Sequence, residues 1–244
     1  MVENGYEKLI KEANESIPLF TTLLDTLKQI IDTQNRTINY LAQIDPEIEL
    51  EVFKENEQLN KFNALITISV LDLLVVCKNL CLASSEWEKI YFTKQGYLII
   101  YETIKTYYKY RSQLQKLIET KHASYIETFK SINNDLRLFK KKHHYDNVIG
   151  LIRNKVAGHI DEDFVLYYNT ISKLDGEKVG LTISNFIQVI AQLQKLSKDL
   201  SSTTNHTLEV EGKSLNILLA KKVANIEEEL SKLESISKNK LPLT

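Results

Sequence analysis

The chain has 244 residues, 31 Lys and Arg against 32 Asp and Glu, and only 7 Gly and 3 Pro. So few turn-forming residues exclude a many-stranded sandwich or barrel, and the length suffices for one sizeable core without disulfide staples. The balanced charge means that any binding of nucleic acid requires a local basic patch. These features predict an all-α protein that is at least about two-thirds helical.

Apolar residues recur at three- and four-residue steps along nearly the whole chain, as in amphipathic helices. The pattern predicts an N-terminal helical extension over residues 1–45, with a break at Pro18 between a short helix and a longer one. A long helix over 48–83 follows. The pair Ser84–Ser85, with acidic residues behind it, predicts a capped start for the next helix, which runs to about Glu119. We expect these two long helices to pack as a hairpin.

The second half of the chain is predicted to hold shorter helices and two breaks. The helical segments are 124–142, 146–157, a short helix that begins at the acidic residues 161–163, and 182–200. Asp175, Gly176 and Gly180 predict a turn before the last of these, and 201–213 is expected to be irregular or strand-like. A terminal amphipathic helix over 214–235 follows. The predicted organisation is therefore an N-terminal helical extension (1–45), a helical core (46–204), and a C-terminal loop and helix (205–244).

The two cysteines and the most apolar run are expected to belong to the core. Cys77 and Cys81 are four residues apart on one helix, a spacing that does not favour a disulfide and offers no further metal ligand. The run 65–82 carries charged residues and is only about long enough to span a bilayer, which favours a buried core helix over membrane insertion. The N-terminal residues are acidic where a signal peptide is basic, which predicts a cytoplasmic protein.

The most specific chemical feature is Arg153-Asn154 followed after four residues by His159. On an unbroken helix His159 would lie about 9 Å along the axis and roughly 120° around from Arg153, too far for joint action on one phosphate. Gly158 predicts a left-handed helix end that returns His159 to the side of Arg153 and Asn154. The alternative interpretation is an exposed arginine and a histidine that caps a helix end.

The segment LIRNKVAGHIDEDF resembles the signature of the HEPN superfamily, an Arg, a polar residue and then a His after four more residues. The resemblance implies a HEPN-like up-and-down helical bundle, here with N- and C-terminal helical extensions, that acts as a dimeric, metal-independent RNase. It implies that Arg153 holds the scissile phosphate, Asn154 orients it and His159 moves protons. In one family branch a partner antitoxin nucleotidylates a Tyr two residues after the His; this sequence has Asp161 there.

Such RNases are common in toxin–antitoxin, abortive-infection and other anti-phage systems, so the resemblance also implies an antitoxin or another regulatory protein as a partner. The side chains suit the chemistry in their own right. Attack of a ribose 2′-OH on its own phosphate needs a base, an acid and a cation on the phosphate oxygens. Because one His does not easily serve as acid and base in the same step, a homodimer that juxtaposes two motifs is expected. No cofactor and no metal ligand cluster is predicted.

Basic residues precede and surround the motif. Arg137, Lys140, Lys141, Lys142 and Lys155 are predicted to bind RNA phosphates; the alternative is a solvated helix end, which cations favour.

Six of the twelve tyrosines lie between Tyr91 and Tyr110. Stacking on bases is one interpretation, and core packing is the preferred one. Tyr101, Glu102 and Lys105 are candidates to reach the active site from that helix. His122 and His206 are expected to be structural.

Three classes of function fit the sequence. The first is a HEPN-type endoribonuclease, a toxin or anti-phage effector that cuts RNA by 2′-OH attack. The second is a catalytically silent HEPN-like module that binds RNA or a partner protein. The third is a structural helical interaction protein. Motif residues that gather around one phosphate favour the first two, and cleavage of RNA separates them.

Overall fold

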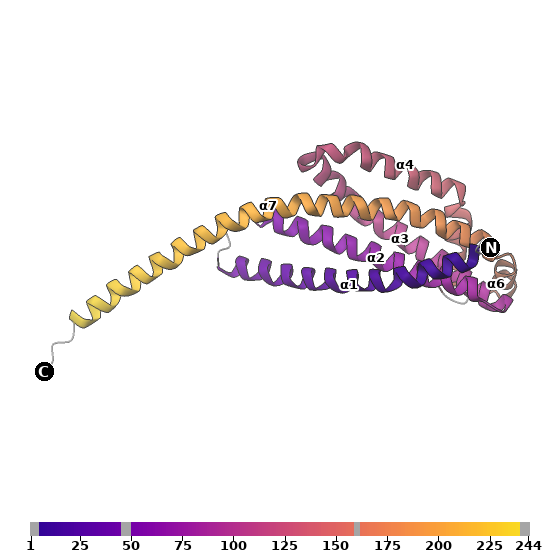
Figure 1. The fold of residues 1–244 in the computed structure, drawn as a ribbon, viewed down its shortest axis with the longest axis horizontal. Coiled ribbons are helices and arrows are strands. Elements are labelled where there is room, and N and C mark those ends of the chain that lie inside the picture. Colours follow the sequence, from indigo (N-terminus) through magenta and orange to yellow (C-terminus); the bar gives the residue numbers. More distant parts are fainter. Residues whose placement is uncertain (1–4, 45–49, 159–161, 240–244) are drawn as a thin grey trace.

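The computed structural model describes residues 5–44, 50–158 and 162–239, and within these ranges it contains helices and no strand. The helices cover far more than the predicted two-thirds of the chain, so the prediction of an all-α protein is confirmed. The five long helices form a bundle in which α4 packs on α3 and on the first half of α7 (Figure 1). Their bounds are α1 Gly5–Ile44, α2 Glu51–Leu82, α3 Glu86–Lys121, α4 Ile126–Lys142 and α7 Gly176–Asn239.

Short helical elements join the long ones. A 3₁₀ turn, η1 (Ala123–Tyr125), connects α3 to α4. Between α4 and α7 the elements are η2 (Tyr145–Ile149), α5 (Gly150–Ile152), η3 (Arg153–Ala157) and α6 (Phe164–Ile171). The prediction that a helix begins at the acidic residues 161–163 is confirmed at Asp163, whose carboxylate accepts the Leu166 N–H at 2.9 Å and caps α6.

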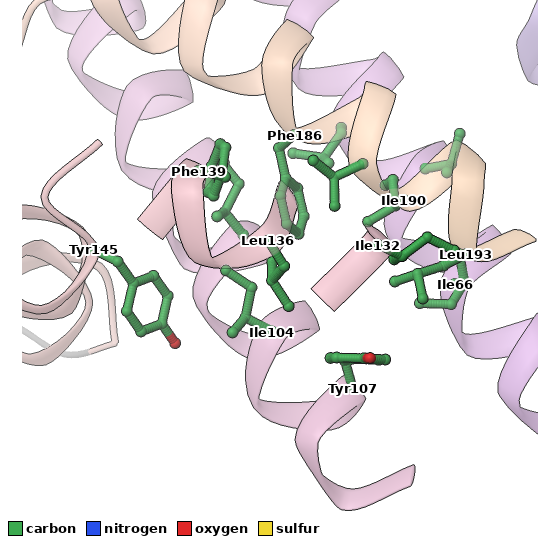
Figure 2. Packing of buried hydrophobic residues seen from close by; sticks show 14 of the residues in the cluster. Ile66, Ile104, Tyr107, Ile132, Leu136, Phe139, Tyr145, Phe186, Ile190 and Leu193 are labelled. Carbon is green, nitrogen blue, oxygen red and sulfur yellow. The ribbon is translucent and has the colours of Figure 1, made fainter. Parts of the chain in front are cut away.

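One hydrophobic core runs through the bundle. Ile104 and Tyr107 of α3, Ile132 of α4 and Phe186 of α7 are at most 1% exposed and pack in the same region as Ile66 of α2 (Figure 2). Burial of each such aliphatic or aromatic side chain is worth about 1.5–3 kcal/mol. The core therefore fixes α3, α4 and α7 relative to one another, which positions the segment between α4 and α7.

The predicted start of α3 is confirmed in detail. The Ser85 hydroxyl accepts the Glu88 N–H at 3.2 Å, and the Glu88 carboxylate accepts the N–H groups of Ser84 and Ser85 at 2.8 and 2.9 Å. This reciprocal pair is a capping box, which satisfies N–H groups that the first helical turn leaves without partners. The hydrogen bonds from Ser85 and Ser84 lower the pKa of Glu88 to about 2. The hairpin of α2 and α3 joined through these serines is also present.

Three predictions are wrong: the break at Pro18, the turn that extends to Gly180, and the irregular segment 201–213. Helix α1 continues through Pro18, because its face against α2 continues on both sides of the proline, with Ala13 and Leu27 buried. Helix α7 continues through Gly180 and through 201–213, so the expected irregular or strand-like segment is helical. There the Thr204 hydroxyl donates back to the Leu200 carbonyl at 2.9 Å and lies buried in the bundle. The low helix propensity of the Ser and Thr residues in this segment therefore does not end the helix.

Helix α2 is the apolar helix of the sequence. Its inner face contributes Phe62, Ile66, Val70 and Leu73 to the core, as a core helix should. By length and composition alone it is also the one helix among the described residues that is able to cross a membrane. The prediction that the protein does not insert into a membrane stays a prediction.

The two cysteines on α2 are free thiols, and both are half-buried. Cys77 packs against the core, and burial raises its pKa to about 11. Both cysteines line a surface groove at the end of α2, and burial raises the pKa of Cys81 as well. The prediction of core thiols therefore fits Cys77 better than Cys81.

Candidate active site

The segment that carries Arg153 is helical but irregular. It consists of two π-turns, η2 and η3, separated by the three residues of α5. A π-turn closes its hydrogen bonds over five residues instead of four, and such turns occur frequently at functional sites. The single helix predicted over 146–157 is therefore only partly right, because the hydrogen-bond spacing changes twice within it.

This segment has a buried side and a polar side. Ile149, Ile152 and Val156 are buried in the core. Arg153 is half-buried and Asn154 is exposed. The apolar residues therefore anchor the π-turns, and the polar residues of the motif lie at the surface next to α3.

The Arg153 guanidinium is held from three directions. Its Nε and Nη2 groups both lie 2.9 Å from Oε1 of Glu102 on α3. Its Nη1 group donates to Oδ1 of Asn154 at 3.0 Å, and its Cζ lies 5.3 Å from the ring centre of Tyr101. A guanidinium carries five N–H donors, of which these contacts with described residues use three. The arrangement orients a planar, permanently charged group of the kind that binds phosphate with two parallel hydrogen bonds.

The pairing with Glu102 serves orientation more than stability. The Arg153 side chain is 33% exposed and that of Glu102 is 42% exposed. Ion pairs this open to solvent are worth roughly 0–1 kcal/mol. Glu102 also lies 3.8 Å from Lys105, one turn further along α3. The carboxylate therefore offsets part of the positive charge at the site and fixes the rotamer of Arg153.

Two stacked tyrosines lie beside Arg153. The rings of Tyr101 and Tyr145 are stacked, with centres 5.5 Å apart and planes 6° apart. The Tyr145 hydroxyl donates to the Tyr101 carbonyl at 3.4 Å, and burial raises the Tyr145 pKa, so this phenol stays neutral at physiological pH. The ammonium of Lys140 lies 4.6 Å from the Tyr145 ring centre and 5.4 Å from that of Tyr108. Cations over aromatic faces in this way are electrostatically attracted to the rings.

The predicted RNA-binding residues differ in their exposure and in their neighbours. Lys140 is half-buried over the tyrosines, whereas Lys141 and Lys142 are exposed at the end of α4. Arg137 is exposed one turn earlier and donates to Asn134 at 2.9 Å. Lys155 is half-buried in η3, directly after Asn154. Lys140 contacts Tyr145, which stacks on Tyr101 beside Arg153.

His143, next to the lysines, is part of the packing between α4 and α7. Its Nδ1 lies 3.0 Å from the Thr182 hydroxyl and its Nε2 lies 3.1 Å from the Asn185 amide. Thr182 donates its own proton to the Lys178 carbonyl at 2.8 Å, so Nδ1 must be the donor and Nε2 accepts from Asn185. Burial lowers the His143 pKa. This histidine is therefore a neutral structural group.

The predicted geometry at Gly158 is wrong. Gly158 has φ −80° and ψ −25°, a right-handed helical conformation, and its N–H donates to the Arg153 carbonyl at 3.0 Å. A Cβ at this position would lie 2.9 Å from that carbonyl oxygen. Glycine is therefore needed for close approach of the backbone in the π-turn, and not for a left-handed helix end. His159 and Asp161 lie outside the described residues.

His122 is structural, as predicted. It is buried at the end of α3, with its Nε2 3.5 Å from the Thr204 hydroxyl, and burial lowers its pKa. The side chain of His206 lies outside the described part of the structure. In the part of the chain that the structure describes, no three His, Cys, Asp or Glu side chains group closely enough to hold a metal ion.

Sequence reasoning missed two residues around the site. Tyr145 was not distinguished from the other tyrosines, although it follows the basic run directly. Arg111, whose Cζ lies 6.0 Å from the Tyr108 ring centre, was also missed. The available signal was the spacing of Tyr101, Tyr108 and Arg111, which are seven and then three residues apart and so share one face of α3.

Comparison with known proteins identifies no relative for this chain: no protein-family model, curated protein or solved structure matches it.

Proposed function

We propose that this protein is a metal-independent, HEPN-type endoribonuclease that cuts RNA by attack of a ribose 2′-OH on the adjacent phosphate. The observation that supports the proposal most directly is the Arg153 guanidinium, which Glu102 and Asn154 hold at a surface edge in a π-turn segment that leads to His159. An oriented, charged fork of this kind suits a phosphodiester whose negative charge grows during the reaction.

The chemistry divides among the three motif residues. In the reaction the 2′ oxygen forms a bond to phosphorus and loses its proton to a base, while the bond from phosphorus to the 5′ oxygen breaks and that oxygen gains a proton from an acid. Arg153 holds the non-bridging oxygens, and Asn154 orients them or Arg153 itself. His159 transfers a proton. The products are a 2′,3′-cyclic phosphate and a 5′-hydroxyl end.

The proposal includes a two-fold homodimer, because one His159 provides a single proton-transfer group and the step needs two. It also includes a cytoplasmic setting and a regulatory protein. An active RNase harms its own cell unless it is restrained, so a toxin or anti-phage effector of this kind requires an antitoxin or an activation step.

The main test is cleavage of single-stranded RNA in the presence of EDTA. Arg153→Ala and His159→Ala should each lower the rate by about a hundredfold or more, through loss of charge stabilisation and of proton transfer respectively. Arg153→Lys keeps the charge but loses the planar fork, so it should fall between wild type and Arg153→Ala. Arg36→Ala, an exposed arginine on α1, is the matched control and should cut like wild type.

Full activity in His159→Ala, or cleavage that requires a divalent metal, would refute the assignment. A second candidate is a catalytically silent RNA-binding module, which the ion pair of Glu102 with Arg153 favours, because the carboxylate offsets the charge that the reaction needs. RNA binding without cleavage at any protein concentration would select this candidate.

A further inference from the structure

Three tyrosines and three cations form a continuous row that starts at Arg153. We call it the tyrosine row; it consists of Tyr101, Tyr145 and Tyr108 with Arg153, Lys140 and Arg111. Arg153 lies over Tyr101, which stacks on Tyr145. Lys140 lies over both Tyr145 and Tyr108, and Arg111 lies over Tyr108 on the side nearer the C-terminus of α3.

The far end of the row is open to solvent. Tyr108 is 44% exposed, whereas its neighbour Tyr107 is 1% exposed and belongs to the core. The core is therefore complete without the Tyr108 ring. Tyr101 is half-buried and Tyr145 is buried, so these two rings pack against the core and only the Tyr108 end of the row is exposed.

The surface along the row is positive beyond Glu102. Within residues 101–118 the only acidic residue is Glu102, and the basic residues are Lys105, Lys109, Arg111 and Lys116. All four basic residues are exposed. From Tyr101 to Arg111 is ten residues, or about 15 Å along the helix axis. Lys105 lies 3.8 Å from Glu102, so a strand that leaves Arg153 along α3 passes from the residues that Glu102 contacts to Lys109 and Arg111.

An exposed aromatic ring with cations close by, here 5.4 and 6.0 Å from the ring centre of Tyr108, is the combination that binds single-stranded nucleic acid. Bases stack on the ring, and the cations track the phosphates. A base in a duplex is already stacked between its neighbours and does not reach such a ring. We propose that a base of single-stranded RNA stacks on Tyr108, with Arg111 and Lys140 on the flanking phosphates, so that the substrate runs from Arg153 along α3. This substrate path rests on the proposed function at Arg153.

Binding of a fluorescein-labelled, fully 2′-O-methylated single-stranded oligonucleotide, followed by fluorescence anisotropy, tests the path without cleavage. Tyr108→Ala should weaken binding by about tenfold, because loss of one base–aromatic stack has that order of effect. Tyr108→Phe keeps the ring and should bind like wild type. The same oligonucleotide annealed to its complement should bind wild type more weakly and should not distinguish Tyr108→Ala from it.

The salt dependence of binding separates the lysines. Lys140→Gln should lower the slope of log affinity against log salt concentration by about 1, as expected for one lost phosphate contact. Lys141→Gln, the next residue on α4 and not over a ring, is the matched control and should change the slope less. Circular dichroism melts of each variant establish that the fold is intact.

Equal binding by wild type and folded Tyr108→Ala, or no binding of the single strand by wild type, would overturn the path. If the wild-type protein binds through Tyr108 but does not cut unmodified RNA, the proposed nuclease function is refuted and the substrate path is supported. If Tyr108→Ala and wild type cut RNA with the same KM, the substrate path is refuted and the nuclease function is supported.

Discussion

Helix α3 and the segment 145–158 meet at the contact between Glu102 and Arg153, and they are built in different ways. Helix α3 is an uninterrupted α-helix of 36 residues that begins at a capping box. The segment 145–158 changes its hydrogen-bond spacing twice within fourteen residues, although its inner side is buried as deeply as that of α3. The two sides of this polar site are therefore positioned differently. Helix α3, which we call the regular wall, is positioned by helical periodicity and its cap. The segment 145–158, which we call the irregular wall, is positioned by packing.

The largest expected effect tests whether the irregular wall is as firmly held as the regular one. Ile104 of α3 and Ile149 of η2 are 1% and 0% exposed. Ile104→Ala and Ile149→Ala should therefore each lower the free energy of unfolding by about 2–5 kcal/mol, measured by urea denaturation. Val148→Ala, at a 38% exposed neighbour, is the control and should cost roughly 0.5 kcal/mol or less. A small loss for Ile149→Ala alone would show that the π-turn segment is only loosely attached.

A smaller effect is expected from one added methyl group in each wall. A Cβ on Gly158 would lie 2.9 Å from the Arg153 carbonyl oxygen, and a Cβ on Gly96 of α3 would lie 2.9 Å from the terminal Cδ1 of Ile183. A backbone carbonyl in a π-turn moves only if the turn changes, whereas the end of a side chain shifts more easily. Gly158→Ala should therefore lower the free energy of unfolding by about 1–3 kcal/mol.

Gly96→Ala should change the free energy of unfolding by less than about 1 kcal/mol, because the better helix propensity of Ala offsets the contact. Thermal unfolding of both variants measures the contrast. Equal losses in the two variants would contradict the view that the π-turn, and not the tightness of the contact, makes Gly158 necessary.

The smallest effect concerns the cap of the regular wall and depends on pH. The pKa of Glu88 is lowered from its ordinary value near 4.5 to about 2, so its contribution to stability is present above about 4.5 and is lost as the pH falls toward 2. Wild type should therefore lose more stability than Glu88→Gln between about pH 5 and pH 3, in urea denaturation at each pH. Ser85→Ala should weaken the pH dependence of the free energy of unfolding over the same range, and should lower that free energy by about 1 kcal/mol at neutral pH. Parallel pH profiles for wild type and Glu88→Gln would contradict the cap assignment.

Local signals in the sequence predicted the bounds of α2, α3 and α4 to within a few residues. The Ser84–Ser85 pair predicted the start of α3, and the acidic residues 161–163 predicted the start of α6. Local signals failed at Pro18 and in the segment 201–213, where the residue types disfavour a helix but the helix continues. Helix α1 packs along α2, and in 201–213 Thr204 is buried next to His122; both contacts lie far away in the sequence.

Local signals also predicted only part of the candidate site. The motif identified Arg153 and Asn154, and the list of nearby candidates included Tyr101, Glu102 and Lys105, two of which contact Arg153 directly. The basic run 140–142 was predicted as one group of equal members. The structure separates Lys140 from the other two, because successive residues of a helix point in directions about 100° apart and only Lys140 reaches the tyrosines.

The sequence by itself determined that this protein is all-α and where α2, α3 and α4 begin, because composition, periodicity and caps act over a few neighbouring residues. Only the tertiary structure decided that Glu102 orients Arg153, that Gly158 serves a π-turn, and that Lys140 of α4 lies over the rings of Tyr145 and Tyr108. The contacts at the site that join α3 to α4 and to the segment after it span 32 to 52 positions of the chain. They exist because the common core holds α3, α4 and α7 in one arrangement, and no local pattern specifies that arrangement.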